Sequence, residues 1–149
     1  MGEHRIRLNW KGGDVPFTYE TYTRNHEITF KDNETLVVSG AAIYHGDGAK
    51  ADPEDLLVAA LSSCHMLSFL AICAKKRLIV ESYEDDAKGF LENDGGKLWI
   101  TRVILQPHVV FAPQTRPTSA EIEHIHHKSH EACFIANSVR SDVRVEPRD

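Results

Sequence analysis

Residues 52–74 read DPEDLLVAALSSCHMLSFLAICA, and this stretch decides the fold because it carries the strongest helix signal in the chain. Asp52 is a typical N-cap, Pro53 suits the first helical position, and two acidic residues follow in the first turn. Apolar residues then occupy almost every side of the predicted helix, which has no wide polar face. Helices of this kind are usually buried, so the sequence predicts a long central helix inside the fold.

The segments on both sides of this helix alternate polar and apolar residues with the period of a β-strand. Strands are predicted over 5–10, 17–23, 27–30 and 35–38 before the helix, and over 79–87, 97–111 and 143–145 after it. The run Asn93-Asp94-Gly95-Gly96 predicts a hairpin turn, and Pro107 is expected to bend the long strand. A second helix is predicted over 119–131. The predicted fold class is α+β, with antiparallel sheets and a long buried central helix.

Length and composition limit the possible functions. The 149 residues fit one domain, 1–149, and 42% hydrophobic with 26% charged residues is the balance of a soluble globular protein. The net charge of −5 and the scattered lysines and arginines predict no nucleic-acid partner. No signal peptide and no uninterrupted apolar run of about 18 residues is evident, so we expect a cytoplasmic protein without a membrane segment.

Three cysteines in such a chain serve as packing residues, metal ligands or reactive thiols. Cys64 lies in the run Ser62-Ser63-Cys64-His65, which places polar groups in an otherwise apolar helix, where they need partners. Cys73 is about 13 Å further along the same helix and half a turn around it, so it cannot bridge to Cys64 and is expected to pack. Cys133 follows on another element and is free to approach Cys64.

The histidines offer an alternative function. His124, His126, His127 and His130 share the second predicted helix, where the 126/130 and 127/130 pairs have the spacing of metal ligands. One alternative is therefore a non-enzymatic ligand- or metal-binding protein that uses this cluster. The competing interpretation is that these histidines only form a polar, solvent-exposed face of the helix. A hydrolase in which Cys64 pairs with a histidine is a third possibility, although no protease signature surrounds Cys64.

Two segments resemble the osmotically inducible protein C and organic hydroperoxide resistance family (OsmC/Ohr). ADPEDLLVAALSSCH, residues 51–65, is similar to the family's Asn-Pro-Glu-x-Leu segment, which precedes its reactive cysteine by ten residues. His130-Glu131-Ala132-Cys133 is similar to the His-x-x-Cys segment of the family's second cysteine. Arg24 occupies the place of the family's N-terminal active-site arginine, and the predicted order of elements matches over essentially the whole chain.

The resemblance implies a cysteine-based peroxidase that reduces organic hydroperoxides to alcohols in oxidative stress defence, with no cofactor. It implies that Cys64 is the peroxidatic thiol, that Cys133 resolves it through a disulfide, and that Arg24 and Glu54 form the polar pair beside them. It also implies an intertwined homodimer with sites at the subunit interface, and an external dithiol as reductant. Phe134 after Cys133 and His65 after Cys64 differ from the family's usual residues, which are proline and phenylalanine.

Helix geometry adds a constraint to this arrangement. Glu54 and Cys64 are about 15 Å apart along one helix, so both line one site only if Glu54 comes from the partner chain or its segment is not helical. We therefore expect composite active sites in an obligate dimer.

Overall fold

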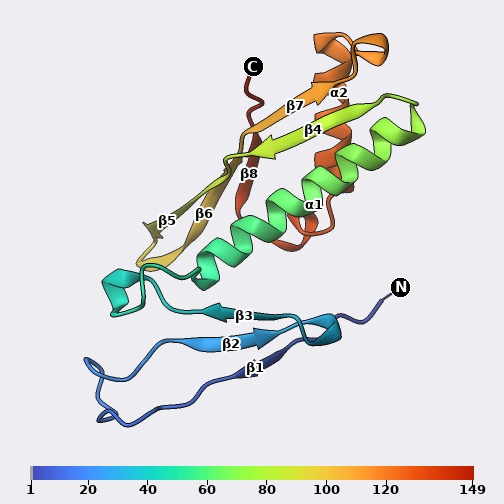
Figure 1. Cartoon of the computed structure of the whole chain (residues 1–149). Helices are drawn as coiled ribbons and strands as arrows, with labels where there is room; N and C mark the ends of the chain where they lie inside the picture. Colours follow the sequence, from blue (N-terminus) through green and yellow to red (C-terminus); the bar gives the residue numbers. More distant parts are fainter. Residues whose placement is uncertain (1) are drawn as a thin grey trace. The chain divides into compact units, whose positions relative to one another are not determined.

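The computed structural model describes residues 2–149 and has the α+β architecture that the sequence predicts (Figure 1). Its contacts divide into two compact units, Met1–Leu56 and Leu57–Asp149, and the helix α1 runs across the boundary between them. The N-terminal unit contains the strands β1 (Arg7–Asn9), β2 (His26–Thr29) and β3 (Thr35–Val38), with short 3-10 turns η1 (Lys31–Asn33) and η2 (Ala42–Tyr44). The three strands form one antiparallel sheet in the order β1-β2-β3 (Figure 1). Leu8 lies opposite Ile28, and Ile28 lies opposite Leu36.

The strand predicted over 17–23 is wrong, because this segment folds into turns. The backbone amides of Thr21 and Tyr22 both donate to the carbonyl oxygen of Thr18, at 3.2 and 3.0 Å. The guanidinium of Arg24 lies 3.6 Å from the ring centroid of Tyr22 and 5.2 Å from that of Tyr19. These local contacts hold the two aromatic residues on one side of the chain, whereas a strand would alternate its side chains.

The central helix α1 spans Pro53–Lys75, as the sequence predicts, and its first turn is capped by two aspartates. The Asp52 carboxylate accepts from the Asp55 amide at 2.9 Å, and the Asp55 carboxylate accepts from the Asp52 amide at 3.1 Å. This reciprocal arrangement satisfies two backbone donors that a helix N-terminus otherwise leaves unpaired.

The burial predicted for α1 is complete along one stripe of residues in the single chain. Only a stripe at every fourth residue is buried: Leu61, His65, Phe69 and Cys73. Leu67 on another side is 60% exposed. Residues of β6, β7 and α2 pack against this stripe, whereas most other apolar side chains of α1 are half-buried and Leu67 is exposed.

By length and composition alone, α1 is also apolar enough to cross a membrane. Its most apolar 18-residue window has a mean hydropathy of 2.1, and 22% of that window is buried. The polar run at 62–65 interrupts the apolar residues, but this average stays high. One such helix is weak evidence, because core helices of soluble proteins have the same length and composition.

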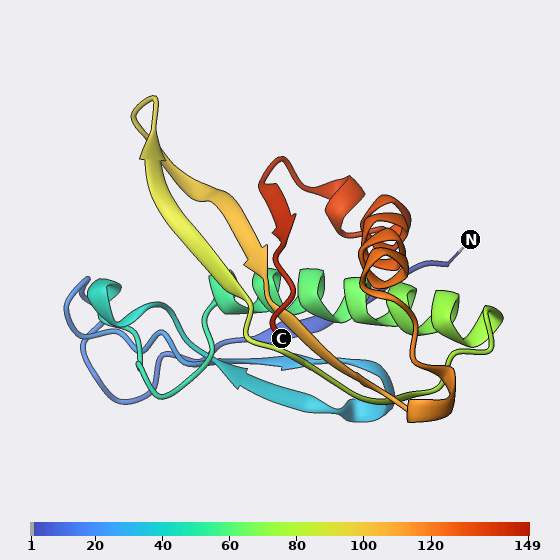
Figure 2. The same ribbon diagram turned by 90° about the horizontal axis from the view of Figure 1, so that it is seen from above.

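The C-terminal unit contains a long hairpin and a second helix. Its elements are β4 (Val80–Asp85), β5 (Lys88–Asp94), β6 (Lys97–Leu105), β7 (Pro107–Phe111), η3 (Pro113–Thr115), α2 (Ser119–Ala132), η4 (Ala136–Ser138) and β8 (Asp142–Val145). β5 and β6 form the predicted hairpin, whose turn uses Gly95 and Gly96 at φ values of 60° and 83°, a region that favours glycine. The predicted break at Pro107 ends β6 and starts β7, which pairs with β4. Figure 2 shows the β5-β6 hairpin extending away from the helices.

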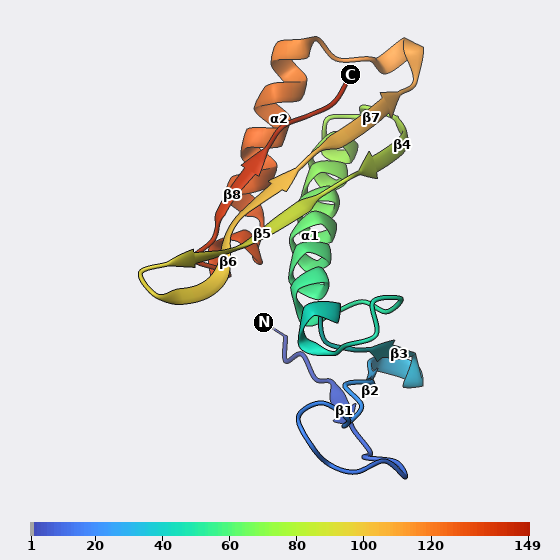
Figure 3. The ribbon, with the colours of Figure 1, turned by 90° about the vertical axis from the view of Figure 1, so that its left-hand side faces the viewer.

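β8 pairs with β6 in parallel, which departs from the predicted antiparallel sheets. The long connection through α2 returns the chain to the middle of β6, so that β8 runs beside residues 102–105 in the same direction (Figure 3). The tail continues this pairing, since the amides of Glu146 and Arg148 donate to the carbonyl oxygens of Leu105 and Pro107 at 2.8 Å.

Two apolar clusters in the C-terminal unit pack against the buried stripe of α1. Leu61 packs with Ile100, Val103 and Leu105 of β6. Phe69 and Cys73 pack with Phe111 of β7 and Ile125 of α2. His65, which lies between these clusters, its neighbour Cys64, and Cys133 at the end of α2 form the candidate site.

Candidate functional site

The thiols of Cys64 and Cys133 are neighbours in the structure. Cys64 is half-buried in the middle of α1, and Cys133, which is 1% exposed, is the C-cap residue of α2. Burial raises the pKa of the Cys133 thiol, and contact with the Cys64 side chain raises it further, although hydrogen bonds from Ala136 and Ile135 act in the opposite direction. The Ala136 amide donates to the Cys133 sulfur at 3.3 Å. Both cysteines are free thiols, and the two lie where one could attack a substrate and the other resolve the product.

The polar residues around Cys64 have the hydrogen-bond partners that polar groups in an apolar helix need. The Ser62 hydroxyl donates to the Asp85 carboxylate at 2.5 Å, and the other oxygen of that carboxylate accepts from the Gln106 amide at 2.6 Å. Asp85 thus ties α1 to the end of β4 and to the junction between β6 and β7. These bonds fix the turn of α1 that carries Cys64.

His65 makes a buried polar contact with α2. It is 1% exposed, and its Nε2 lies 3.1 Å from Nδ1 of His126, which is 4% exposed on α2. The two rings are parallel within 5°, and the ring of Phe69 lies 4.4 Å from that of His126. Burial lowers the pKa of both imidazoles to about 4, so both are neutral near pH 7. A neutral pair shares one hydrogen bond across the contact between α1 and α2.

Cys73 has the packing role predicted for it. It is 1% exposed inside the apolar cluster of Phe69, Phe111 and Ile125. Burial raises the pKa of its thiol to about 11, although the charge of Lys76 lowers it. A thiol that stays protonated at neutral pH is neither a nucleophile nor a metal ligand.

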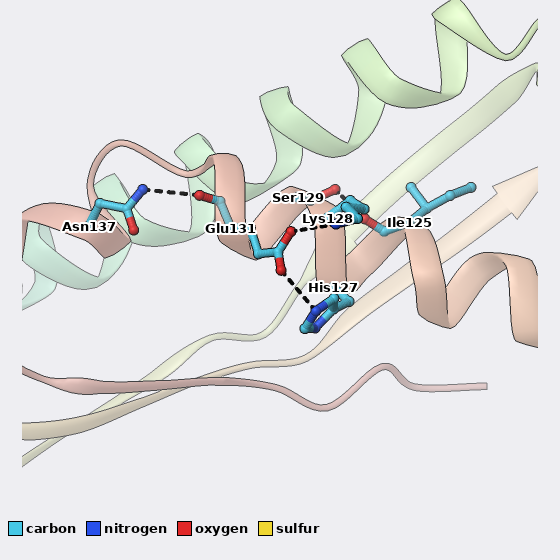
Figure 4. Close-up of polar contacts among 6 residues, drawn as sticks. All are labelled: Ile125, His127, Lys128, Ser129, Glu131 and Asn137. Atoms are coloured by element: carbon cyan, nitrogen blue, oxygen red, sulfur yellow. Dashed lines mark hydrogen bonds and ion pairs between the residues drawn. The ribbon is translucent and has the colours of Figure 1, made fainter.

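The four histidines of α2 do not converge on a metal. His126 turns inward to His65, whereas exposed His127 lies 3.0 Å from the Glu131 carboxylate, which also accepts from Lys128 at 2.8 Å (Figure 4). His124 is exposed and His130 is half-buried. Across residues 2–149, no group of three histidine, cysteine or acidic side chains has the geometry to hold a metal ion. The metal-binding alternative is therefore not supported, because helical spacing brings the ligands onto one element without pointing them at one centre.

Arg24 has an enclosed environment in the N-terminal unit. Its guanidinium donates to the carbonyl oxygen of Tyr22 at 2.6 Å and to that of Tyr19. Its Nε is buried and has no hydrogen-bond partner among residues 2–149. The side chain is thus held by aromatic rings and carbonyl oxygens rather than by a carboxylate, and it keeps an unused donor.

Glu54 lies in the first turn of α1 and is half-buried. Among residues 2–149, it forms no ion pair with Arg24 or with any other side chain. The predicted pair of Arg24 and Glu54 is not formed within one chain, and its formation in a dimer stays a prediction.

The sequence reasoning missed His126 and Asp85 as partners of the run around Cys64. A signal for His65 was present, since it occupies the same face of α1 as Leu61 and Phe69 at four-residue intervals. A histidine on a buried face needs a polar partner, which pointed to a second buried polar residue elsewhere. Nothing in the spacing showed which of the α2 histidines that partner is.

A chain with these two neighbouring thiols, a long α1 and a hairpin-rich α+β fold is of the type found in OsmC-like proteins. The family described as OsmC-like protein matches residues 46–148. The chain belongs to this family, which confirms the resemblance drawn from the sequence.

Known relatives agree with this assignment. An OsmC-like protein of unknown function from Vibrio cholerae has a solved structure that is 44% identical, with a TM-score of 0.94 over 99% of this chain and 100% of that one. The organic hydroperoxide resistance protein OhrB of Bacillus subtilis shares the fold, with 16% identity and a TM-score of 0.69 over 99% of this chain and 98% of that one. The uncharacterized protein YmaD of Bacillus subtilis is 19% identical over 98% of this chain and 93% of its own length.

Proposed function

We propose that the protein is a thiol-dependent peroxidase that reduces organic hydroperoxides to alcohols. The observation that carries the proposal is the juxtaposition of the Cys64 and Cys133 thiols across two helices. The names of several solved family members, such as organic hydroperoxide resistance proteins, agree with this function. A chain that only packed its cysteines would not need two of them together beside a run of polar groups.

The environments of the two thiols assign their order of reaction. Cys64 is the more exposed of the two and attacks the terminal oxygen of the hydroperoxide as a thiolate. The O–O bond breaks, Cys64 becomes a sulfenic acid, and the alkoxide takes up one proton and leaves as the alcohol. Cys133 then gives its proton to the sulfenic oxygen and attacks the sulfenic sulfur as a thiolate, so that the S–O bond breaks, the Cys64–Cys133 disulfide forms and water leaves. An external dithiol reduces this disulfide and restores both thiols.

Cys133 suits the resolving role. Its burial and its raised pKa make it less reactive toward the peroxide than the more exposed Cys64. Its place at the C-cap of α2, with its sulfur accepting from the Ala136 amide, keeps it beside Cys64. Fast resolution protects the sulfenic acid from further oxidation.

A positive group must stabilise the Cys64 thiolate and the departing oxygen, and we assign this role to Arg24 in a homodimer with composite sites. A guanidinium stays charged when desolvated, and Arg24 has an unused Nε donor. Glu54 would hold it through a charge-assisted pair in the dimer. The uncovered apolar surface of α1, which includes Leu67, is available for the partner chain. A chain that sediments as a monomer and is fully active would contradict this arrangement.

A steady-state assay tests the activity. Consumption of dithiothreitol should depend on cumene hydroperoxide, and Cys64→Ser should abolish it. Arg24→Lys keeps the charge but loses the planar donor, and we expect it to lower kcat/KM by about 10²-fold, as removal of one preorganised donor does. Arg144→Gln, which removes an exposed ion pair with Asp142, serves as a control that leaves turnover unchanged. Equal turnover in Cys64→Ser and the unmodified chain would exclude the proposal.

A further inference from the structure

A pocket lies in the C-terminal unit, on the side of α2 that faces β7, β8 and the C-terminal tail. It encloses about 630 Å³, a volume in the range of small-molecule sites. Four of the nine histidines of the chain line it: His108, His126, His127 and His130. Neither Cys64 nor Cys133 is among its lining residues, so it is separate from the thiol site.

His126 supplies a polar group that lacks a partner. One of its ring nitrogens contacts His65, and the other, Nε2, is buried without a hydrogen-bond partner among residues 2–149. The Nδ1 atom of His130, one turn further along α2, is also buried and has no hydrogen-bond partner among these residues. Buried polar atoms in folded proteins nearly always have a partner, and leaving one unpaired is unfavourable. Both atoms have almost no accessible surface, and a turn of each imidazole toward the pocket that its residue lines would expose the atom to a ligand with a hydrogen-bonding group.

The contact between the two histidines defines what that group must be. Both imidazoles are neutral, so one of the two contacting nitrogens carries the hydrogen and the other accepts it. When His65 donates, Nε2 of His126 carries a hydrogen and is a donor; when His126 donates, its Nε2 is an acceptor. A hydroxyl group can match either state, whereas a carboxylate matches only the first and an ammonium group only the second.

The rest of the lining favours an apolar, uncharged body. Ile122, Val109, Val143 and Val145 contribute apolar surface. The charges in the lining have both signs, since Arg116 and Glu123 both contribute, and Arg148 is already bound to Asp86 at 2.5 Å. A ligand with a net charge gains little from such a mixture.

We propose that this pocket binds a neutral alcohol or phenol with an apolar body, whose hydroxyl group hydrogen-bonds to the imidazole of His126. The proposal does not depend on the thiol chemistry, because the pocket and the thiol pair share no residue. A transition-metal ion is the competing ligand for a histidine-lined pocket, but residues 2–149 offer no group of three ligands for one.

The test is a titration followed by the NMR signals of the histidine rings, with three probes of one shape. Para-tert-butylphenol has the hydroxyl group, para-tert-butyltoluene replaces it by methyl, and para-tert-butylbenzoate carries a charge. The phenol should bind saturably, with a Kd about tenfold lower than those of the other two, which is the contribution of one hydrogen bond of about 1.4 kcal/mol. No saturable binding of the phenol, or equal binding of all three probes, would overturn the proposal, as would stoichiometric binding of zinc in the same pocket.

Variants locate the site. His126→Phe keeps the aromatic volume and should remove the preference for the phenol over the toluene analogue. If His126→Phe does not fold, Glu123→Trp, at an exposed position on α2, should fill the pocket and block binding. Arg144→Gln is the matched control, because Arg144 lies between two pocket residues of β8 without lining the pocket itself. Cys64→Ser should bind the phenol as the unmodified chain does. An unchanged Kd in Glu123→Trp would contradict the assigned pocket, and loss of binding in Cys64→Ser would place the phenol at the thiol pair instead.

Discussion

The buried pair of His65 and His126 makes the stability of the protein depend on pH in a way that can be calculated. Both imidazoles have a pKa of about 4 in the folded chain because they are buried, against about 6.5 for an unfolded histidine. Between these values the unfolded chain binds more protons than the folded chain, so the free energy of unfolding falls as the pH is lowered through this window. Above about pH 6.5, both states are unprotonated and the effect vanishes.

The size of the effect follows from the two pKa values. Between pH 7 and pH 5, one imidazole with this shift lowers the free energy of unfolding by about 2 kcal/mol. The two imidazoles together lower it by about 4 kcal/mol, because the unfolded chain protonates both, whereas the folded chain keeps both largely neutral at pH 5. This is a large share of the stability of an ordinary domain.

Urea denaturation at pH 7 and pH 5 measures this change directly. The double variant His65→Phe/His126→Phe keeps aromatic volume at both positions and should lose most of the drop between the two pH values. His127→Gln, at an exposed position, should behave as the unmodified chain does. A stability that stays constant from pH 7 to pH 5, or an equal drop in the double variant, would refute the assignment of two buried neutral imidazoles.

Three further outcomes follow from the packing and the thiol environments. Leu61→Ala removes a fully buried side chain beside Ile100 and Val103, and urea denaturation should show a loss of about 3 kcal/mol. Thr118→Ala removes the N-cap of α2, whose hydroxyl accepts from the Glu121 amide, and should lower stability by about 1 kcal/mol without changing the fold by circular dichroism. Cys73 should react with iodoacetamide only after unfolding, because its pKa is raised to about 11; labelling of Cys73 in the native protein as fast as Cys64 would contradict its packing role.

The parts of the fold that the sequence predicts best are those with local chemical signals. The aspartate cap fixes the start of α1, Thr118 and Glu121 form the capping box of α2, and two glycines form the turn between β5 and β6. The parallel pairing of β8 with β6 could not be predicted, because it depends on where α2 returns the chain and not on the pattern of β8 itself. The strand predicted over 17–23 is wrong for a related reason. The guanidinium of Arg24 packs over the rings of Tyr19 and Tyr22, and this contact overrides the alternating pattern of the segment.

The candidate site was predictable only in part. The resemblance to a known family singled out Cys64 and Cys133, and the structure places them together. The histidine pair was not predicted, because spacing along α2 groups four histidines whereas the packing against α1 selects one of them. Residues that meet from two different helices leave little trace in either helix alone.

The measurement that tests the proposed peroxidase most directly is a count of free thiols by mass spectrometry, before and after one equivalent of cumene hydroperoxide. We expect two thiols to be lost and a pair of peptides linked through a Cys64–Cys133 disulfide to appear, while Cys73 stays free. Cys64→Ser should lose no thiol under the same conditions. Three unreacted thiols in the unmodified protein would contradict the account and would make Cys64 a packing residue.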